Sequence, residues 1–442
     1  MSDFSCYGGS SQEWLALEQS LPPATGAEVP LQDMVRLANE EREVVARNSM
    51  IKLAPKVQIQ NYTIPSRDGS SIQARSYRPV EAAEDALLPL YIHFQGGGFM
   101  FGTLDSEDAI CARIAIGTNV AVLNIDYRHT PEFTYPTQWN DAEDAFEWAH
   151  ENMDMLRCDP QKVIMGGISA GAWVAASFTL QRHLNRTTNR RPSIAGQVLM
   201  IPCLAHIDCY EPQLTKMKHE SISSYKQNEL APMLSVSELR WFTSLLKIEN
   251  PDINDLKINP GNASPEQVKG MPPTVLGIVG LDPLRDEALL YAKMLTEAGV
   301  PTDVNLFIGL PHGFRSYEEK LSASARWDKV IEDASHIMLF EAGADISARD
   351  DDGQTPLHAA AHEGSPLAFQ ALVDAGADLE ALNNAGETPL ISSARKTQRL
   401  DVPRLLVKAG ANLNATTLEE ESIVDTAAGY PALVKFWENA RE

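Results

Sequence analysis

The sequence predicts an α/β domain followed by an all-α repeat module. From about residue 57 to residue 338, short apolar runs typical of buried strands alternate with stretches whose apolar residues recur at helical spacing. One of these strands runs into the pentapeptide Gly167–Gly171, GISAG, at a sharp turn. Beyond residue 338 the pattern changes, because the segment that begins at Gly353 recurs 33 residues later at Gly386.

The amino-acid composition indicates which partners the protein can have and in which cellular compartment it lies. The chain has 442 residues, and its 37 basic residues against 60 acidic ones argue against nucleic acid or an anionic membrane as a partner. Its five cysteines are an odd number without metal-ligand spacing, which predicts reduced thiols and no metal site. The first residues lack the basic and apolar regions of a leader, and no run of about eighteen apolar residues occurs. We therefore expect a cytoplasmic protein with no membrane span.

The N-terminal region predicts a long helix and then a hairpin. An apolar stripe from Leu31 to Met50 predicts a helix that packs on the main body, and this helix could also close over a pocket. Val57–Ile64 and Ser71–Tyr77 alternate apolar and polar residues on either side of the turn signal Arg67–Gly69. This alternation predicts an antiparallel hairpin.

A glycine-rich stretch follows the next strand. Leu88 to Gly102, LPLYIHFQGGGFMFG, combines an apolar strand with three consecutive glycines and an aromatic residue. Glycines in this position let backbone N–H groups point into a cavity, as an oxyanion hole requires. A plain glycine loop is the alternative interpretation.

The stretch from Lys162 to Val174, KVIMGGISAGAWV, is the centre of the predicted domain. An apolar strand, Val163–Met165, precedes the glycines, and Ala170 and Trp173 begin a helical pattern after them. Ser169 therefore stands between the end of a strand and the start of a helix. This is the context of a G-x-S-x-G nucleophile elbow, in which a strained turn exposes the serine hydroxyl. The alternative is a small-residue turn with a capping serine.

Three motifs together resemble one family. HFQGGGF, then DYRHTPEFTYPTQWNDAEDAFEW from Asp126 to Trp148, and GISAG are similar to motifs of the hormone-sensitive lipase family of α/β-hydrolases. The resemblance covers residues 1–338 and implies an α/β-hydrolase fold, with a helical cap from about 1–55 and 203–265. It also implies a buried strand starting near Asp126, a helix over Trp139–Asn152, and a structural role for Tyr127 and Arg128 beneath the nucleophile.

The resemblance also assigns the oxyanion hole. The family's HGGG motif aligns with Gln95–Gly98, so that Gln95 stands where the family has histidine. His93 lies two positions early, within the predicted strand, and does not simply replace that histidine. Because a glutamine amide can still hydrogen-bond backbone groups, we expect the loop to keep its shape. The N–H groups of the oxyanion hole are assigned to Gly97, Gly98 and Ala170.

The catalytic acid and base are expected after the last two strands. Asp282 follows a predicted strand that ends at Gly280, and the resemblance makes it the carboxylate that orients the histidine. Asp286 and Glu287 are the alternatives. His312 follows the last predicted strand, which is where the fold needs its general base. In the chain order of α/β-hydrolases, the predicted catalytic triad is Ser169, Asp282 and His312.

Residues 339–442 carry the ankyrin period. Their T-P-L-H-x-A motif is accompanied by a second marker, which recurs after 33 and then 34 residues at Ala342–Asp345, Ala375–Asp378 and Ala409–Asn412. The last of about three repeats, near Ser422–Ala427, is degenerate and suited to capping. Almost no linker precedes the repeats, so we expect the helix Ser322–Phe340 to close the first domain and also to cover the first repeat with Leu339 and Phe340. The repeats would then dock on the first domain or bind a protein partner.

The predicted function is hydrolysis of a small or medium ester, thioester or lactone through an acyl-enzyme, with no metal or organic cofactor. The segment DSEDAICARIA is most similar to fungal members of the family, several of which act in secondary-metabolite pathways. Two alternatives stay open. The triad could catalyse acyl transfer, lactonisation or elimination on a biosynthetic intermediate, or Gln95 could mark a weakened enzyme that serves as an ankyrin scaffold.

Overall fold

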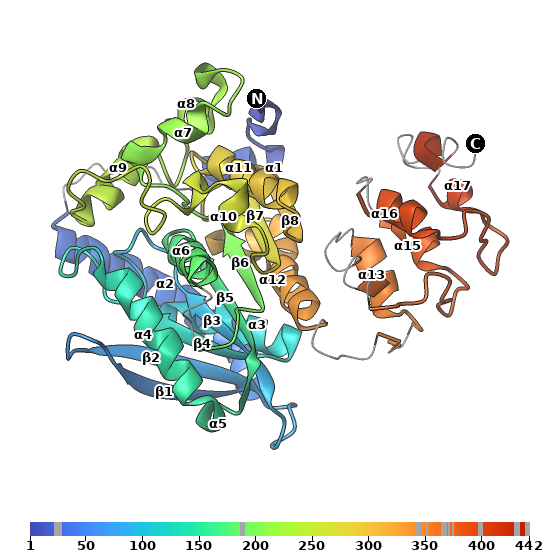
Figure 1. Ribbon diagram of the computed structural model, residues 1–442, viewed down its shortest axis with the longest axis horizontal. Helices are drawn as coiled ribbons and strands as arrows, with labels where there is room; N and C mark the ends of the chain where they lie inside the picture. Colours follow the sequence, from blue (N-terminus) through green and yellow to red (C-terminus); the bar gives the residue numbers. More distant parts are fainter. Residues whose placement is uncertain are drawn as a thin grey trace. The chain divides into compact units, whose positions relative to one another are not determined.

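The chain folds into two compact units, Met1–Ser335 and His336–Glu442, and each is considered by itself (Figure 1). The computed structural model describes residues 1–21, 29–185, 191–340, 346–347, 349–350, 352–363, 369, 372–373, 375–396, 401–427 and 434–437. Among the helices it describes, none is long and apolar enough to cross a membrane.

A mainly parallel eight-stranded sheet forms the centre of the first unit. Its strands are β1 (Val57–Pro65), β2 (Ser71–Pro79), β3 (Leu88–Phe94), β4 (Ala121–Asp126), β5 (Cys158–Ile168), β6 (Gly196–Met200), β7 (Thr274–Leu281) and β8 (Thr302–Pro311). They lie in the order β1-β2-β4-β3-β5-β6-β7-β8. The pairs β1/β2 and β2/β4 are antiparallel, and the other neighbours are parallel. Because strands β3 to β8 run in one direction, their carboxyl ends meet at one edge, where ligands bind in open α/β sheets.

Helices cover both faces of this sheet. The longer helices of the first unit are α1 (Gln12–Ser20), α2 (Leu31–Leu53), α3 (Leu104–Thr118), α4 (Thr137–Glu151), α6 (Ala170–Leu184), α9 (Val236–Leu245), α11 (Arg285–Glu297) and α12 (Ala323–Phe340). Short helical turns are α5 (Met153–Leu156), α7 (Glu211–Leu214), α8 (Ser224–Gln227) and α10 (Pro265–Val268). Helices α4 and α6 lie together on one face, and α3 and α12 on the other (Figure 1).

The predicted hairpin is confirmed, because β1 and β2 pair from Val57 with Pro79 to Pro65 with Ser71. The prediction of a strand that starts near Asp126 was wrong. Strand β4 ends at Asp126 and the chain then forms a loop up to Thr137, where α4 begins. The apolar residues precede Asp126, as Val122, Leu123 and Ile125, whereas the residues after it are mostly polar or proline.

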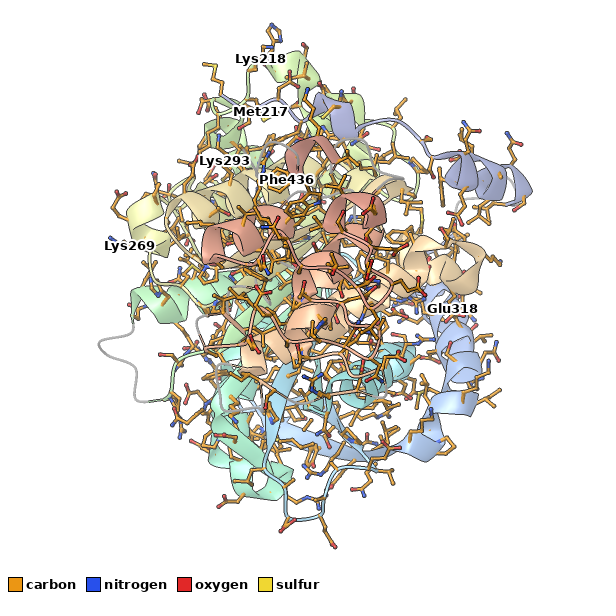
Figure 2. All side chains as sticks on the ribbon, turned by 90° about the vertical axis from the view of Figure 1, so that its right-hand side faces the viewer. Met217, Lys218, Lys269, Lys293, Glu318 and Phe436 are labelled. Carbon is orange, nitrogen blue, oxygen red and sulfur yellow. The ribbon has the colours of Figure 1, made fainter. Side chains whose placement is uncertain are left out.

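The N-terminal segment is tied to the region after β6. Ser2 forms a parallel bridge with Met217, and its carbonyl accepts a hydrogen bond from Lys218 N at 2.8 Å. Figure 2 labels Met217, Lys218 and also Lys293, whose amino group donates to Ser2 Oγ at 3.3 Å. These contacts hold the first residues of the chain beside the segment that follows α7 and beside α11.

An aromatic cluster lies beneath the loop that follows β3. The ring of Phe99 packs against Trp139 of α4 and Trp173 of α6, with centroids 5.3 and 5.7 Å apart. The two tryptophans meet edge to face at 5.5 Å. All three side chains are buried, so this loop rests on the main hydrophobic core rather than on solvent.

The second unit consists of helical repeats. The helices α13 (Pro356–Glu363) and α15 (Pro389–Lys396) each begin at the proline of the repeated motif, and α16 (Asp401–Ala409) and the short α17 (Ile423–Thr426) follow. His358 Nδ1 accepts a hydrogen bond from the Thr355 N–H at 3.1 Å, and its Nε2 donates to the Glu387 carbonyl at 2.8 Å. The T-P-L-H motif thus caps its own helix and joins it to the next repeat.

Some of the sequence predictions for this region lie outside the described residues. These are the first copy of the second marker, Ala342–Asp345, and the packing of the side chains of Leu339 and Phe340. Helix α12 itself extends to Phe340, as predicted.

Candidate active site

Ser169 occupies a sharp turn between β5 and α6. Its backbone has φ 54° and ψ −116°, outside the favoured regions for a residue with a side chain. The Ser169 N–H donates to the Met200 carbonyl at 2.8 Å, which ties the turn to the end of β6. This strained conformation is the one that exposes a nucleophilic hydroxyl at the top of a sheet.

The two glycines of the pentapeptide permit a close approach of strand and helix. A Cβ atom on Gly167 would overlap the backbone of Gly171, and one on Gly171 would overlap the carbonyl of Phe94. Any larger residue at either position would push α6 away from β3 and β5. The pattern G-x-S-x-G is therefore required by the packing around the turn.

The structure brings the three predicted triad residues together. Ser169 Oγ lies 2.8 Å from His312 Nε2, and His312 Nδ1 lies 2.7 Å from Asp282 Oδ2. Asp282 directly follows β7 and His312 directly follows β8, so the parallel strands deliver both side chains to the same edge. Asp282 is buried, whereas His312 is partly exposed to the cavity described below.

The surroundings of Asp282 fix its orientation. Its Oδ1 accepts a hydrogen bond from the Leu284 N–H at 2.9 Å, which leaves Oδ2 for the histidine. Asn228 donates to the carbonyls of Gly280 and Asp282 at 3.1 and 2.9 Å and so holds the strand end. The structure places the two alternative carboxylates elsewhere: Asp286 pairs with Arg285 at 2.8 Å, and Glu287 accepts from the Leu204 N–H at 2.5 Å. Burial, together with the charge of Asp282, raises the pKa of Glu287 to about 8.

The loop after β3, residues 95–103, carries the predicted oxyanion glycines. Gly97 and Gly98 have φ values of 132° and 62°, conformations that glycine adopts easily. Their N–H groups donate to no acceptor within the described residues, whereas the Gly97 carbonyl accepts from Met100 N and Phe101 N. A Cβ atom on Gly98 would overlap the ring of Phe242, a residue of α9. We refer to residues 95–103 as the oxyanion loop.

Helix α2 holds the outer side of the oxyanion loop. Arg42 donates to the Gly96 carbonyl at 3.2 Å and to Glu107 at 2.9 Å, and Asn39 accepts from the Gly102 N–H at 2.8 Å. Burial alone would raise the pKa of Glu107, but hydrogen bonds and charges from His93 and Arg42 hold that pKa below its ordinary value.

The same helix also contacts the segment that follows His312. Ser49 of α2 donates to Glu318, labelled in Figure 2, at 2.6 Å. Helix α2 therefore contacts two sides of the site, the oxyanion loop and the chain beyond His312.

A cavity of about 770 Å³ opens at Ser169 and His312. Its walls are largely apolar and include Val45, Ala46, Leu234, Leu239, Phe242 and Trp327. These residues come from α2, from the region between β6 and β7, and from α12. The volume lies in the range of small-molecule sites, which span about 300–1,000 Å³. No group of three or more metal-ligating side chains occurs in the described part of the chain.

A comparison with family models decides the family. Residues 90–316, more than half of the chain, match a model described as the alpha/beta hydrolase fold. This chain is a member of the α/β-hydrolase family. Residues 327–417 match ankyrin repeats in three copies, so the predicted fold class and the predicted combination of modules are confirmed.

Individual relatives of this hydrolase are esterases. It is 31% identical to Esterase LipI of Mycobacterium tuberculosis over 60% of its own length and 77% of that protein. It is 29% identical to versiconal hemiacetal acetate esterase of Dothistroma septosporum over 58% of its length and 74% of that protein. The crystal structure of vibralactone cyclase superposes with a TM-score of 0.68 at 25% identity, covering 78% of this chain and 98% of that one. The esterases support ester hydrolysis as the reaction class of this hydrolase.

The Gln95 amide in this hydrolase makes other contacts than the predicted hydrogen bonds to backbone groups. Its side chain is fully buried and bonds two side chains instead of backbone groups. Gln95 Nε2 lies 2.8 Å from His129 Nε2 and 3.3 Å from Asp126 Oδ1. His93 points elsewhere and meets Glu107 at 3.1 Å. Tyr127 does brace the loop, because its hydroxyl donates to the Gln95 carbonyl at 2.8 Å.

Sequence reasoning missed three parts of the site. His129 was inside a quoted motif but was not singled out, Arg42 was only one residue of an amphipathic helix, and Phe242 was one of several aromatics in the cap region. The signals were weak for a physical reason. Each of these side chains acts on a loop far away in the chain, and no local spacing records such a contact.

Proposed function

We propose that this hydrolase cleaves small to medium carboxylic esters by way of an acyl-enzyme on Ser169. The observation that carries the proposal is the chain of two short hydrogen bonds from Ser169 through His312 to Asp282. These hydrogen bonds lie at an apolar cavity, beside the N–H groups of Gly97 and Gly98, which have no acceptor among the residues that the structure describes. These are the groups that acyl transfer needs in one place.

In this mechanism His312 Nε2 takes the Ser169 proton while Oγ attacks the substrate carbonyl carbon. Asp282 holds the proton of His312 on Nδ1 and stabilises the imidazolium that forms. The N–H groups of Gly97, Gly98 and Ala170 bind the oxyanion of the tetrahedral intermediate. Its collapse releases the alcohol, which receives the proton from His312. Water then attacks the acyl carbon with the same base and the same oxyanion donors, and the acid leaves.

The substrate class follows from the cavity and from the relatives. Its apolar walls and its volume of about 770 Å³ suit an ester, thioester or lactone of small to medium size. One relative is by name an acetate esterase and one structural neighbour is by name a cyclase. From these two names we infer that the natural substrate is an intermediate of a secondary-metabolite pathway.

The direct test is turnover of p-nitrophenyl esters of increasing chain length by the full chain and by its Ser169→Ala variant. Loss of the nucleophile should lower kcat by about 10⁶-fold while the melting temperature stays the same. Ser71→Ala, at an exposed position at the start of β2, is the matched control and should keep full activity. If Ser169→Ala retains most of its turnover, the proposed mechanism is wrong.

Lactonisation is the second candidate function, and the similarity to vibralactone cyclase favours it specifically. In this reaction a hydroxyl of the acyl group, rather than water, attacks the acyl-enzyme. The test is product analysis with a hydroxyacyl ester. A lactone that forms faster than the free acid identifies the cyclase reaction, and the hydroxy acid alone identifies a hydrolase.

For the ankyrin repeats we propose a role in protein interaction, either with a separate partner or with the hydrolase itself. Removal of residues 341–442 distinguishes the two. A lower melting temperature of the remaining hydrolase, with all triad residues still present, indicates docking on the hydrolase. An unchanged melting temperature with full esterase activity indicates a separate partner.

A further inference from the structure

Gln95 lies at the centre of a small polar cluster beneath the oxyanion loop. Three of the four residues from Asp126 to His129 contact it. Asp126 and His129 accept hydrogen bonds from its side-chain amide, and Tyr127 donates to its main-chain carbonyl. The fourth, Arg128, faces away and pairs with Asp141 at 2.6 Å. One short segment at the end of β4 thus supplies three hydrogen-bond contacts to Gln95.

The chemistry of the cluster defines the direction of these bonds. Burial, with a smaller contribution from the Arg42 charge, lowers the pKa of His129 to about 4, so the ring is neutral near pH 7. Its Nε2 can therefore accept a hydrogen bond from Gln95. The opposite orientation of the amide would place its oxygen 3.3 Å from the Asp126 carboxylate, which is unfavourable. The amide nitrogen therefore faces both acceptors.

Gln95 packs directly against the nucleophile helix and against the far end of the oxyanion loop. A Cβ atom on Gly171, at the start of the nucleophile helix, would lie 2.5 Å from the Gln95 carbonyl oxygen. One on Gly102 would lie 2.8 Å from the Gln95 side-chain amide carbon. Gln95, the first residue of the oxyanion loop, therefore packs closely against Gly102 near the other end of this loop and against the helix that begins at Ala170. The Gln95 side chain therefore has no free space on the side of Gly102, and its main chain has none on the side of Gly171.

His93, the other histidine near the oxyanion loop, does not hold the Gln95 amide. His93 Nε2 meets Glu107, and within the described residues it makes no hydrogen bond with Gln95. The Gln95 amide oxygen also has no hydrogen-bond partner in the described part of the chain. The hydrogen bonds to Asp126 and His129 are therefore what fix the amide, and the bond to His129 is the shorter of the two.

We propose that His129 is a positioning residue for ester hydrolysis, which holds Gln95 so that the N–H groups of Gly97 and Gly98 stay aligned with the oxyanion. This inference rests on the proposed function of Ser169, Gly97 and Gly98.

The test is a double-mutant cycle on the full chain with p-nitrophenyl acetate. His129→Leu removes the acceptor and should lower kcat by about tenfold to a hundredfold, with KM nearly unchanged, because a misplaced oxyanion donor acts on the transition state. Gln95→Leu should cost a similar factor, and the double variant should be no worse than the poorer single variant. His129→Gln returns an acceptor oxygen near the position of Nε2 and should restore most of the rate.

A matched control is His150→Leu on α4. His150 is also a partly buried histidine with a lowered pKa, and its hydrogen bond goes to the Phe146 carbonyl, far from the loop. The His150→Leu substitution should leave kcat unchanged. Wild-type kcat in His129→Leu, or losses that simply multiply in the double variant, would overturn the inference. So would a failure of His129→Gln to recover activity while its melting temperature is normal.

Labelling by a fluorophosphonate, followed by mass spectrometry, separates this inference from the proposed function. If the unmodified chain is not labelled at Ser169, the proposed function fails. If it is labelled and His129→Leu is labelled at the same rate, only the role of His129 fails. Slower labelling of His129→Leu, with Ser169 still the modified residue, supports both.

Discussion

The proposed active site has two halves that are built in different ways. The triad half uses side chains at the carboxyl ends of β5, β7 and β8, and each is placed by the strand that directly precedes it. The proposed oxyanion half uses backbone N–H groups, two of them on the loop after β3, and that loop is contacted by side chains of other elements, namely α2 and the residues after β4. A catalytic side chain needs one well-placed strand end, whereas a catalytic backbone group needs neighbours that hold a whole loop.

The largest expected difference between the halves is the effect of a single atom in the triad half. Asp282→Asn keeps the size of the side chain but would stabilise the wrong tautomer of His312, so kcat should fall by about 10⁴-fold. Steady-state turnover with p-nitrophenyl acetate is the measurement. Asp208→Asn, at an exposed carboxylate, is the control. A loss below tenfold would show that Asp282 does not orient the histidine.

The oxyanion half should respond more weakly to the loss of one supporting bond. Tyr127→Phe removes the hydroxyl that donates to the Gln95 carbonyl and should lower kcat by about tenfold with little change in KM. Tyr62→Phe, whose hydroxyl lies 3.4 Å from Ser76 on the outer strands, should have no effect. If Tyr127→Phe raises KM and spares kcat, Tyr127 acts on substrate binding instead of the loop.

Phe242 contacts both the oxyanion loop and the cavity. Its ring covers Gly98 and lines the cavity, so Phe242→Ala should open space for longer acyl chains. We expect the ratio of kcat/KM for p-nitrophenyl octanoate to kcat/KM for p-nitrophenyl acetate to rise by about tenfold. A change of this size is typical when space for apolar groups is added to a pocket. Leu230→Ala is the control, because Leu230 is an exposed apolar residue of the same region and does not line the cavity in the described residues. An unchanged chain-length preference would place the acyl group elsewhere.

The smallest expected effect concerns the support beneath the triad half. The pKa of Glu287 is raised from its ordinary 4.5 to about 8 by burial, so the folded chain binds this proton more tightly than the unfolded one. Its contribution to stability is complete below about pH 4.5 and is lost as the pH rises toward 8. Between pH 5 and 8 the melting temperature of Glu287→Gln should fall less than that of the unmodified chain. Glu297→Gln, exposed on the same helix, is the control, and parallel curves would contradict the raised pKa.

The same contrast explains what could be predicted from the sequence. Ser169 lies in a local pattern of strand, turn and helix, and Asp282 and His312 follow recognisable strands, so the order of motifs along the chain was enough to select them. His129 meets Gln95 from 34 positions away, and neither residue has a pattern that indicates the other. The contacts of Arg42 and Phe242 likewise exist only after the sheet has assembled. Local periodicity records which residues are buried, but not which loop they hold.

The contacts of α2 have a consequence for the order of folding. This helix is made early in the chain, yet its partners are Gly96, Gly102 and Glu318, and the last of these lies 269 residues beyond Ser49. Closing such long separations is slower than forming local helices and hairpins. The helix can form at once, but it docks only when the sheet and the chain beyond β8 are in place. During refolding, far-ultraviolet circular dichroism should therefore recover before ester turnover does.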